Sequence, residues 1–194
     1  MQRKTFSDMI CPVARTLDRV GEWWSMLILR DAFHGLTRFD QFETSLGIAP
    51  NMLARRLTAL VEAGLLERHR YSERPPRYEY HLTEKGRDFW SVLVALSEFG
   101  NRHFASEGVA SRLVDAETGK PARPVLVDRE TGRPIDQSKF KFAPGPAADA
   151  TLRMRMRYAD ERRAKRDGRE EWDEYVRLSA KRLAPKRVAS KRAR

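Results

Sequence analysis

The sequence predicts an α+β fold that is mainly α-helical, and two observations support this prediction. Residues 12–64 hold four consecutive segments whose apolar residues recur every three or four positions, the period of an amphipathic helix. Residues 65–83 instead hold two short alternating segments separated by a proline pair, which is typical of a β-hairpin. A further helical pattern follows at residues 84–104. The expected order is therefore four helices, two strands and a long helix.

Glycines mark the ends of the first three predicted helices. The first helix follows Pro12, a residue suited to the first helical position, and ends at Gly21. The second, "EWWSMLILRDAFHG", is apolar on most sides, so we expect it to be largely buried. The third, "TRFDQFETSLG", has Thr37 as its expected N-cap and ends at Gly47.

The fourth predicted helix, residues 50–64, divides into two faces. Its leucines recur at helical spacing and form the inner face, whereas Arg55 and Arg56 fall outside that face. The strands "LLERHRY" and "RYEYHLT" follow, and we expect "SERPP" between them to be a loop because two prolines cannot continue a strand ladder. Thr83 is the expected cap of the last long helix, "EKGRDFWSVLVALSEFGNRHF".

These elements, in this order, match the parts of a winged helix-turn-helix. An α-helix fits the major groove of DNA, where its N-terminal residues reach base edges and arginines pair with guanine or phosphate. A stiff loop with Arg74 and Arg77 beside its prolines suits a phosphate or a minor-groove contact. Each arginine taken alone is more often a solvated surface residue, so the inference depends on the order of the elements.

Three stretches carry a family resemblance: "CPVARTLDRVGEWWSMLILRDAFHGLTRFDQFETSLG", "NMLARRLTALVEAGLLERHRY" and "RPPRYEYHLTEKG". They resemble the HxlR family of winged-helix regulators, part of the larger MarR-like group, over roughly residues 11–104. The resemblance implies a homodimeric transcription factor, usually a repressor, that binds double-stranded DNA. Carried onto this sequence, the resemblance and the arginine positions together give the expected DNA-binding residues Pro50, Asn51, Met52, Arg55, Arg56, Arg74 and Arg77.

Asn51 departs from the serine-type residue that many of these relatives have at the start of the helix. Asparagine can form a bidentate pair with adenine, or it can cap the helix. We favour capping or a phosphate contact for Asn51, so the base preference of the family is not transferred to this chain.

The last predicted helix has more apolar surface than a small helical core covers, which favours a partner helix from a second copy. The alternative is that residues 105–150 cover this surface. The resemblance also implies a dimer formed by the N-terminal and the long C-terminal helices. The expected dimer-interface residues are Phe89, Leu93, Leu96 and Phe99.

Cys11 is the single cysteine, so an internal disulfide and a zinc site with several thiolates are excluded. The position before Pro12 is at or next to a helix N-terminus, where the dipole favours the thiolate. The resemblance implies a redox or electrophile sensor at this position in some members, and the alternative is a small residue buried at a dimer seam. Longer relatives carry cysteine pairs in two turns of the second region, which this sequence lacks. We expect no metal and no cofactor, and we leave open a small-molecule pocket beside the last helix.

Charge and composition suggest three regions. Residues 1–104 form the expected DNA-binding and dimerisation domain, with a net charge of +2. Residues 105–150 are neutral overall and contain two copies of L-V-D-x-E-T-G-[KR]-P, which predict a small metal-free extension of β-hairpin type. Residues 151–194 form a basic tail with a net charge of +9, expected to be partly helical or disordered. Most of the chain's excess charge of +11 therefore lies in the tail.

Two classes of function remain open. A sequence-specific regulator would bind DNA through residues 50–64 and the hairpin, whereas a protein- or RNA-binding winged-helix module would take its affinity from the basic tail. An enzyme is not expected, since no catalytic or phosphate-loop motif occurs. The sequence has no apolar run long enough to span a bilayer, so we expect a cytoplasmic, nucleoid-associated protein without membrane contact.

Overall fold

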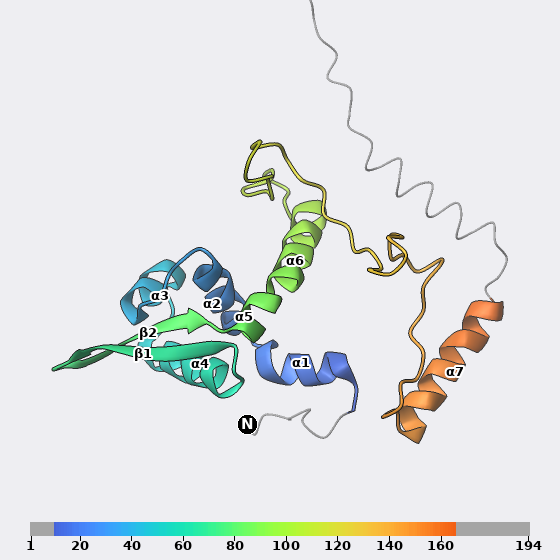
Figure 1. Cartoon of the computed structure of the whole chain (residues 1–194), viewed down its shortest axis with the longest axis horizontal. Helices are drawn as coiled ribbons and strands as arrows, with labels where there is room; N and C mark the ends of the chain where they lie inside the picture. The colour runs from blue at the N-terminus through green and yellow to red at the C-terminus, as the bar shows by residue number, and fades with distance from the viewer. Residues whose placement is uncertain (1–9, 166–194) are drawn as a thin grey trace, which may run out of the picture. The chain divides into compact units, whose positions relative to one another are not determined.

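The computed structural model describes residues 10–165 and is shown in Figure 1. The chain divides into two compact units, residues 1–141 and 142–194. This single division falls between the two that the sequence suggested, after residues 104 and 150. The part of the basic tail beyond residue 165 lies outside the described residues.

The described part of the first unit has the predicted types of element in the predicted order. The hairpin projects past α3 and α4 (Figure 1). In chain order the elements are α1 (Pro12–Val20), α2 (Trp23–Phe33), α3 (Phe39–Leu46), α4 (Pro50–Glu62), β1 (Leu66–Glu73), β2 (Pro76–Leu82), α5 (Glu84–Asp88) and α6 (Trp90–His103).

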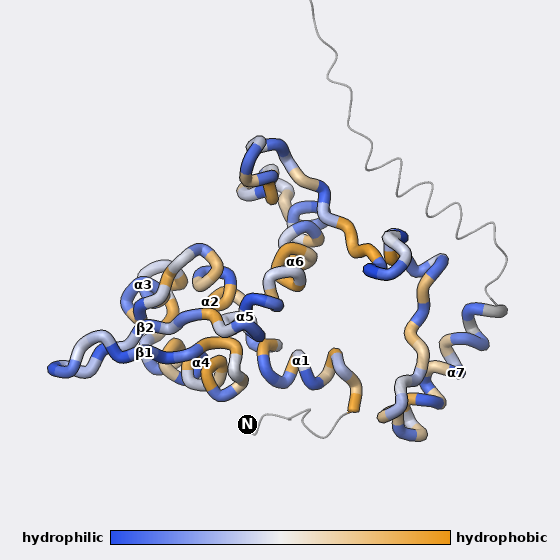
Figure 2. Tube along the Cα trace, viewed as in Figure 1, coloured by the Kyte–Doolittle hydropathy of each residue, from blue (hydrophilic) through white to orange (hydrophobic). Residues whose placement is uncertain are grey.

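The core lies between the helices and the base of the hairpin. Ile28 and Leu29 of α2 are fully buried, as the apolar character of that segment predicts, and Phe42 of α3 is fully buried beside them. Figure 2 shows the hydrophobic stretches of α2 and α4 and the hydrophilic far end of the hairpin. The buried cluster comprises Val20, Ile28, Leu29, Phe42, Ile48, Leu53, Leu57, Leu60, Leu65, Leu66 and Phe89.

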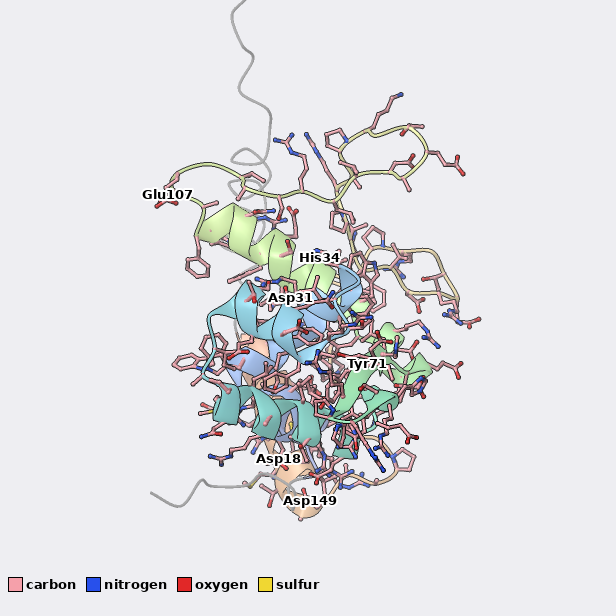
Figure 3. The ribbon with its side chains drawn as sticks, turned by 90° about the vertical axis from the view of Figure 1, so that its left-hand side faces the viewer. Asp18, Asp31, His34, Tyr71, Glu107 and Asp149 are labelled. Atoms are coloured by element: carbon pink, nitrogen blue, oxygen red, sulfur yellow. The ribbon has the colours of Figure 1, made fainter. Side chains whose placement is uncertain are left out.

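A buried carboxylate joins α2 to α3. Asp31 is 3% exposed. The Ser45 hydroxyl donates to its Oδ2 at 2.7 Å, and the Arg30 Nε donates to its Oδ1 at 2.8 Å. Figure 3 labels Asp31 among the helices. Because a buried carboxylate is costly unless it is hydrogen-bonded, the bond from Ser45 fixes α3, the first helix of the helix-turn-helix, against α2.

One predicted helix cap is wrong, and the capping role considered for Asn51 is excluded. The N-cap of α3 is Arg38 instead of Thr37, because Gln41 Oε1 accepts from both the Thr37 and Arg38 amides at 2.9 Å and so takes over the capping of this turn. The N-cap of α4 is Ala49, with Pro50 at the first helical position. Asn51 is therefore the second residue of the helix, two positions after the N-cap, and does not cap it.

The predicted long last helix is interrupted at Phe89. The cap at its start is confirmed, since the Thr83 hydroxyl accepts from the Gly86 amide at 2.9 Å. The Phe89 amide then bonds to the Gly86 carbonyl at 3.1 Å, a three-residue spacing tighter than that of an α-helix. Phe89 itself is 8% exposed and belongs to the buried cluster. The tight turn separates α5 from α6 where this side chain enters the core.

The hairpin is longer than the sequence predicted. β1 and β2 are antiparallel, and Pro76 is the first residue of β2, paired with Glu73. The prediction that Pro76 belongs to the loop is wrong, because proline is tolerated as the first residue of a strand. Only Arg74 and Pro75 lie between the two strands.

The two repeat copies form matched turns instead of longer strands. Each closes with a single β-bridge, Val114 to Pro121 and Val127 to Pro134. In the first turn, Asp115 Oδ1 accepts from the Thr118 amide at 2.7 Å and from its hydroxyl at 2.8 Å. Both bonds lower the pKa of Asp115, and the bond from the Thr118 amide has the larger effect. Residues 105–150 are therefore less β-rich than predicted. Side-chain hydrogen bonds close each turn, so each repeat has one β-bridge in place of a pair of longer strands.

The described part of the second unit contains α7 (Ala150–Lys165). This helix begins at the boundary of the basic tail, which was expected to be partly helical or disordered, and the tail beyond residue 165 stays a prediction. Within residues 10–165, no helix has the length and the apolar character needed to cross a membrane.

Candidate nucleic-acid interface

The N-terminal half of α4 presents a polar outer face on a fixed support. Leu53 and Leu57 are fully buried and hold one side of the helix against the core. On the other side, Pro50, Asn51 and Arg55 are exposed. Met52, also predicted to contact DNA, is half-buried and packs against the core cluster. A helix held rigidly by its inner leucines can offer its outer residues to a groove without reorganisation.

Arg56 occupies a different environment from Arg55. Its Nη2 lies 2.9 Å from Glu22 Oε2, and its side chain is only 16% exposed. Glu22 is the N-cap residue of α2, so this ion pair joins α4, the second helix of the helix-turn-helix, to the start of α2. Arg56 Nε is buried with no hydrogen-bond partner among the described residues. The structure therefore brings Asn51 and Arg55 together on the outer face and directs Arg56 inward.

The hairpin ends in exposed arginines on a braced tip. Arg74 lies between the strands, and Arg77 is paired with Ser72 in the register. Both arginine side chains are exposed. The tip is held by Arg70, whose Nε and Nη2 donate to the carbonyls of Ser72 and Glu73 at 3.2 and 3.0 Å. No local sequence pattern indicates this role of Arg70, because its guanidinium meets the tip carbonyls only through the fold of the hairpin.

Contacts from the start of α3 fix the base of the hairpin. Arg38 Nε donates to Glu79 Oε1 at 3.0 Å, and the Tyr80 amide donates to the Thr37 carbonyl at 2.7 Å. The Arg38 guanidinium also lies 4.8 Å from the ring centroid of Tyr71, a residue labelled in Figure 3. The hydrogen bond from Arg38 lowers the pKa of Glu79 and raises that of Arg38. The hairpin is thus oriented by the first helix of the helix-turn-helix.

Two histidines meet across the hairpin. His69 lies on β1 and His81 on β2, and their ring centroids are 5.1 Å apart. Each ring nitrogen Nε2 lies near a carboxylate two residues away, Glu67 at 3.5 Å and Glu79 at 3.4 Å. The strand register could have revealed this proximity. Among the described residues, no group of three or more histidine, cysteine or acidic side chains could hold a metal ion.

The predicted dimer residues divide between the core and the surface. Phe89 lies in the chain's own core, and Leu93 packs partly buried against it, which leaves little of either side chain for a partner. Leu96 and Phe99 are 51% and 52% exposed on α6. Further large apolar side chains are exposed on α6, just after it, on α1 and at the start of α2: Trp90, Val92, Phe104, Val13, Leu17 and Trp23.

Cys11 is the N-cap residue of α1, as the sequence predicted, and it is half-buried. Its carbonyl accepts from the Arg15 amide at 3.0 Å, while its thiol forms no capping bond to the helix.

Known proteins have a similar sequence in this region. Residues 19–108 match the model of the HxlR-like helix-turn-helix family. The HTH-type transcriptional regulator Rv3095 of Mycobacterium tuberculosis is 41% identical over 141 residues, which cover 72% of this chain and 89% of that protein. The HTH-type transcriptional regulator sll1512 of Synechocystis is 36% identical over 109 residues, or 56% and 81% of the two chains.

Two solved structures have a similar fold. PA1374 of Pseudomonas aeruginosa, a candidate transcription factor, is 53% identical with a TM-score of 0.56, and the match covers 75% of this chain and 99% of that one. PA1607, also a candidate transcription factor, is 40% identical with a TM-score of 0.65, covering 73% and 100%.

Proposed function

Because this chain belongs to the HxlR-like helix-turn-helix family of DNA-binding transcriptional regulators, we propose that it is a homodimeric, sequence-specific repressor that binds double-stranded DNA through α4 and the hairpin. The observation that carries this proposal is the pairing of a rigid α4, with Asn51 and Arg55 exposed, with a braced hairpin that carries Arg74 and Arg77. The assignment as a repressor rests on the family resemblance.

In the proposed complex, α4 lies in the major groove. Arg55 donates to the N7 and O6 atoms of guanine or to a phosphate, and Asn51 contacts a base edge or a phosphate near the helix N-terminus. Arg74 and Arg77 reach the neighbouring backbone or minor groove, where a narrow groove attracts arginine. The folded region has a net charge near neutrality, so its affinity must come from the placement of these cations.

The second copy covers the exposed apolar surface of α6 in this proposal. Leu96 and Phe99 are its centre, because both are more than half exposed on a helix that is otherwise anchored to the core through Leu93. A two-fold dimer places its two recognition helices about 34 Å apart, one turn of DNA, and so requires a pseudo-palindromic site.

A protein that binds chromosomal DNA would act in the cytoplasm, on the nucleoid. The proposed role is regulatory, not enzymatic, and involves no cofactor. Regulation by an electrophile at Cys11, or by a small molecule, stays a prediction. The half-buried thiol at a helix N-terminus is compatible with the first of these.

Gel shifts with the protein's own upstream DNA, at two salt concentrations, test the proposal. We expect a sequence-selective complex that Arg55→Ala weakens, while the control Arg112→Ala, at an exposed arginine outside α4 and the hairpin, leaves it unchanged. Removal of residues 151–194 should lower affinity but preserve selectivity. The absence of any selective complex, or its complete loss with the tail, would favour the module whose affinity comes from the tail.

A further inference from the structure

One cation of the hairpin is left without a role by the contacts described above. The guanidinium groups of Arg38 and Arg56 pair with carboxylates, and that of Arg70 binds backbone carbonyls. Arg68, in the middle of β1, is exposed, and among the described residues its recorded neighbours are two tyrosines instead of an acid.

The strand register places Arg68 on the same side of the hairpin as the core. Arg68 is opposite Tyr80, and Leu66 is opposite Leu82. Opposed residues of an antiparallel pair point to the same face, and alternate residues share it. Leu66 is buried in the cluster to which α4 contributes its leucines, and Leu82 and Tyr80 pack against that cluster. Arg68 therefore lies on the side of the hairpin that faces the core and α4, two residues further along β1 than the buried Leu66.

The guanidinium of Arg68 stacks on the ring of Tyr78, and Tyr80 lies opposite Arg68 in the strand register. Arg68 Cζ lies 4.3 Å from the ring centroid of Tyr78. Tyr80, half-buried, has its pKa raised by burial, an effect that the charge and hydrogen bond of Arg68 partly offset. Stacking on Tyr78 restricts the rotamers of Arg68, so less conformational entropy is lost when its N–H groups meet an acceptor.

We infer that Arg68, held by Tyr78, binds a DNA phosphate between the groove occupied by α4 and the one approached by the hairpin tip. This inference rests on the proposed function and adds a positioned phosphate contact to it. Arg68 has no acidic partner among residues 10–165, and a charge in a fixed position sets the orientation of a protein on the duplex. Because phosphates are common to all sequences, Arg68 contributes equally to selected and unrelated DNA.

The test is the salt dependence of DNA binding by the full-length chain, measured by fluorescence anisotropy. The probes are a duplex recovered by in-vitro selection with the wild-type protein and a scrambled duplex of equal length. One lost phosphate contact reduces the slope of log affinity against log salt by about 0.9. Arg68→Gln should therefore weaken binding about 3.5-fold more at 50 mM than at 200 mM salt, on both duplexes.

Three variants separate this contact from a general effect. Arg68→Lys keeps a charge while it loses the planar stack, so it should retain the wild-type slope, and any defect in folding caused by the lost stack would appear in it too. Tyr78→Phe keeps the ring and should bind as the wild type does, whereas Tyr78→Leu should weaken binding. Arg133→Gln is the matched control, since Arg133 is also exposed and lies 5.6 Å from the ring centroid of Phe140, away from the hairpin.

A wild-type slope in Arg68→Gln, or an equal loss in Arg133→Gln, would overturn the inference while leaving the proposed function intact. If the wild-type protein itself shows no preference for the selected duplex, it is the proposed function that fails.

Discussion

The Arg56 guanidinium lies 2.9 Å from the Glu22 carboxylate, while Arg55, its neighbour in sequence, is exposed. The two arginines are 100° apart around the helix, so one turns towards α2 and the other towards solvent. Substitutions at these adjacent positions should therefore affect different properties.

We expect Arg56→Ala to lower the free energy of unfolding by about 1–3 kcal/mol, because Glu22 loses the donor of a partly buried hydrogen bond. Arg55→Ala should change it by less than about 0.5 kcal/mol, as is usual for a surface position. Urea unfolding of both variants measures the difference as a shift of the midpoint at constant m-value. Equal stability of the two variants would contradict the structural role of Arg56.

Gly86 has no room for a side chain. A Cβ atom built on it would lie 2.1 Å from the Leu65 carbonyl oxygen, a backbone atom that cannot move aside without disturbing β1. Gly86→Ala should therefore destabilise the chain by about 1–3 kcal/mol.

Gly100 provides the control for this substitution. It lies within α6 with nothing within 4 Å of the added Cβ, so Gly100→Ala should stabilise by about 0.5–1 kcal/mol. Thermal unfolding followed by circular dichroism should give changes in Tm of opposite sign. A lower Tm for both variants would mean that the close contact between Gly86 and Leu65 is not the cause of the destabilisation by Gly86→Ala.

The Arg38–Glu79 pair gives a prediction for acid. The hydrogen bond from Arg38 lowers the pKa of Glu79 below its ordinary value of 4.5, so the folded chain holds this carboxylate ionised more readily than the unfolded chain does. The resulting stabilisation is present above about pH 4.5 and is lost as the pH falls through the lower folded pKa. Glu79→Gln should thus destabilise at pH 7 and have a smaller effect at pH 3.

Urea unfolding at the two pH values measures this difference, and Glu117→Gln, at an exposed turn residue with no resolved contact to Arg38, serves as the control. A Glu79→Gln effect that is the same at both pH values would show that the ion pair does not contribute.

The proposed dimer depends on the exposed part of α6. Phe99→Glu or Leu96→Glu would bury a charge in an apolar interface, so each should convert the dimer to a monomer in sedimentation velocity. Val125→Glu is the control, because Val125 is 70% exposed but lies outside α6. A dimer that survives both α6 substitutions would place its interface elsewhere.

The sequence predicted the helices and the hairpin because apolar periodicity and glycine or proline boundaries are local signals. It also predicted that Asn51, Arg55 and Arg56 lie outside the apolar face of α4; Asn51 and Arg55 are exposed there, whereas Arg56 is half-buried. It could not predict that Arg56 pairs with Glu22, since 34 positions separate these residues and only the packing of α4 on α2 joins them. The same applies to Arg38 and Glu79. The interruption at Phe89 was missed because its apolar side chain fits the helical pattern of the whole segment.

Local side-chain bonds account for the remaining errors. The side chain of Gln41, inside α3, accepts from the amides at the start of the helix. The preference for threonine at an N-cap pointed instead to Thr37. In the repeats, Asp115 closes its turn through Thr118, so the flanking residues need only one bridge where the sequence suggested strands.

The central claim, that α4 occupies the major groove through its exposed N-terminal half, is tested most directly by methylation interference on a selected duplex. Methylation of guanine N7 blocks the major groove, whereas methylation of adenine N3 blocks the minor groove. We predict two clusters of N7 interference about 10 base pairs apart, with individual guanines lost from the pattern in Arg55→Ala and retained in Arg112→Ala. Interference confined to adenine N3, or an N7 pattern unchanged by Arg55→Ala, would contradict the account.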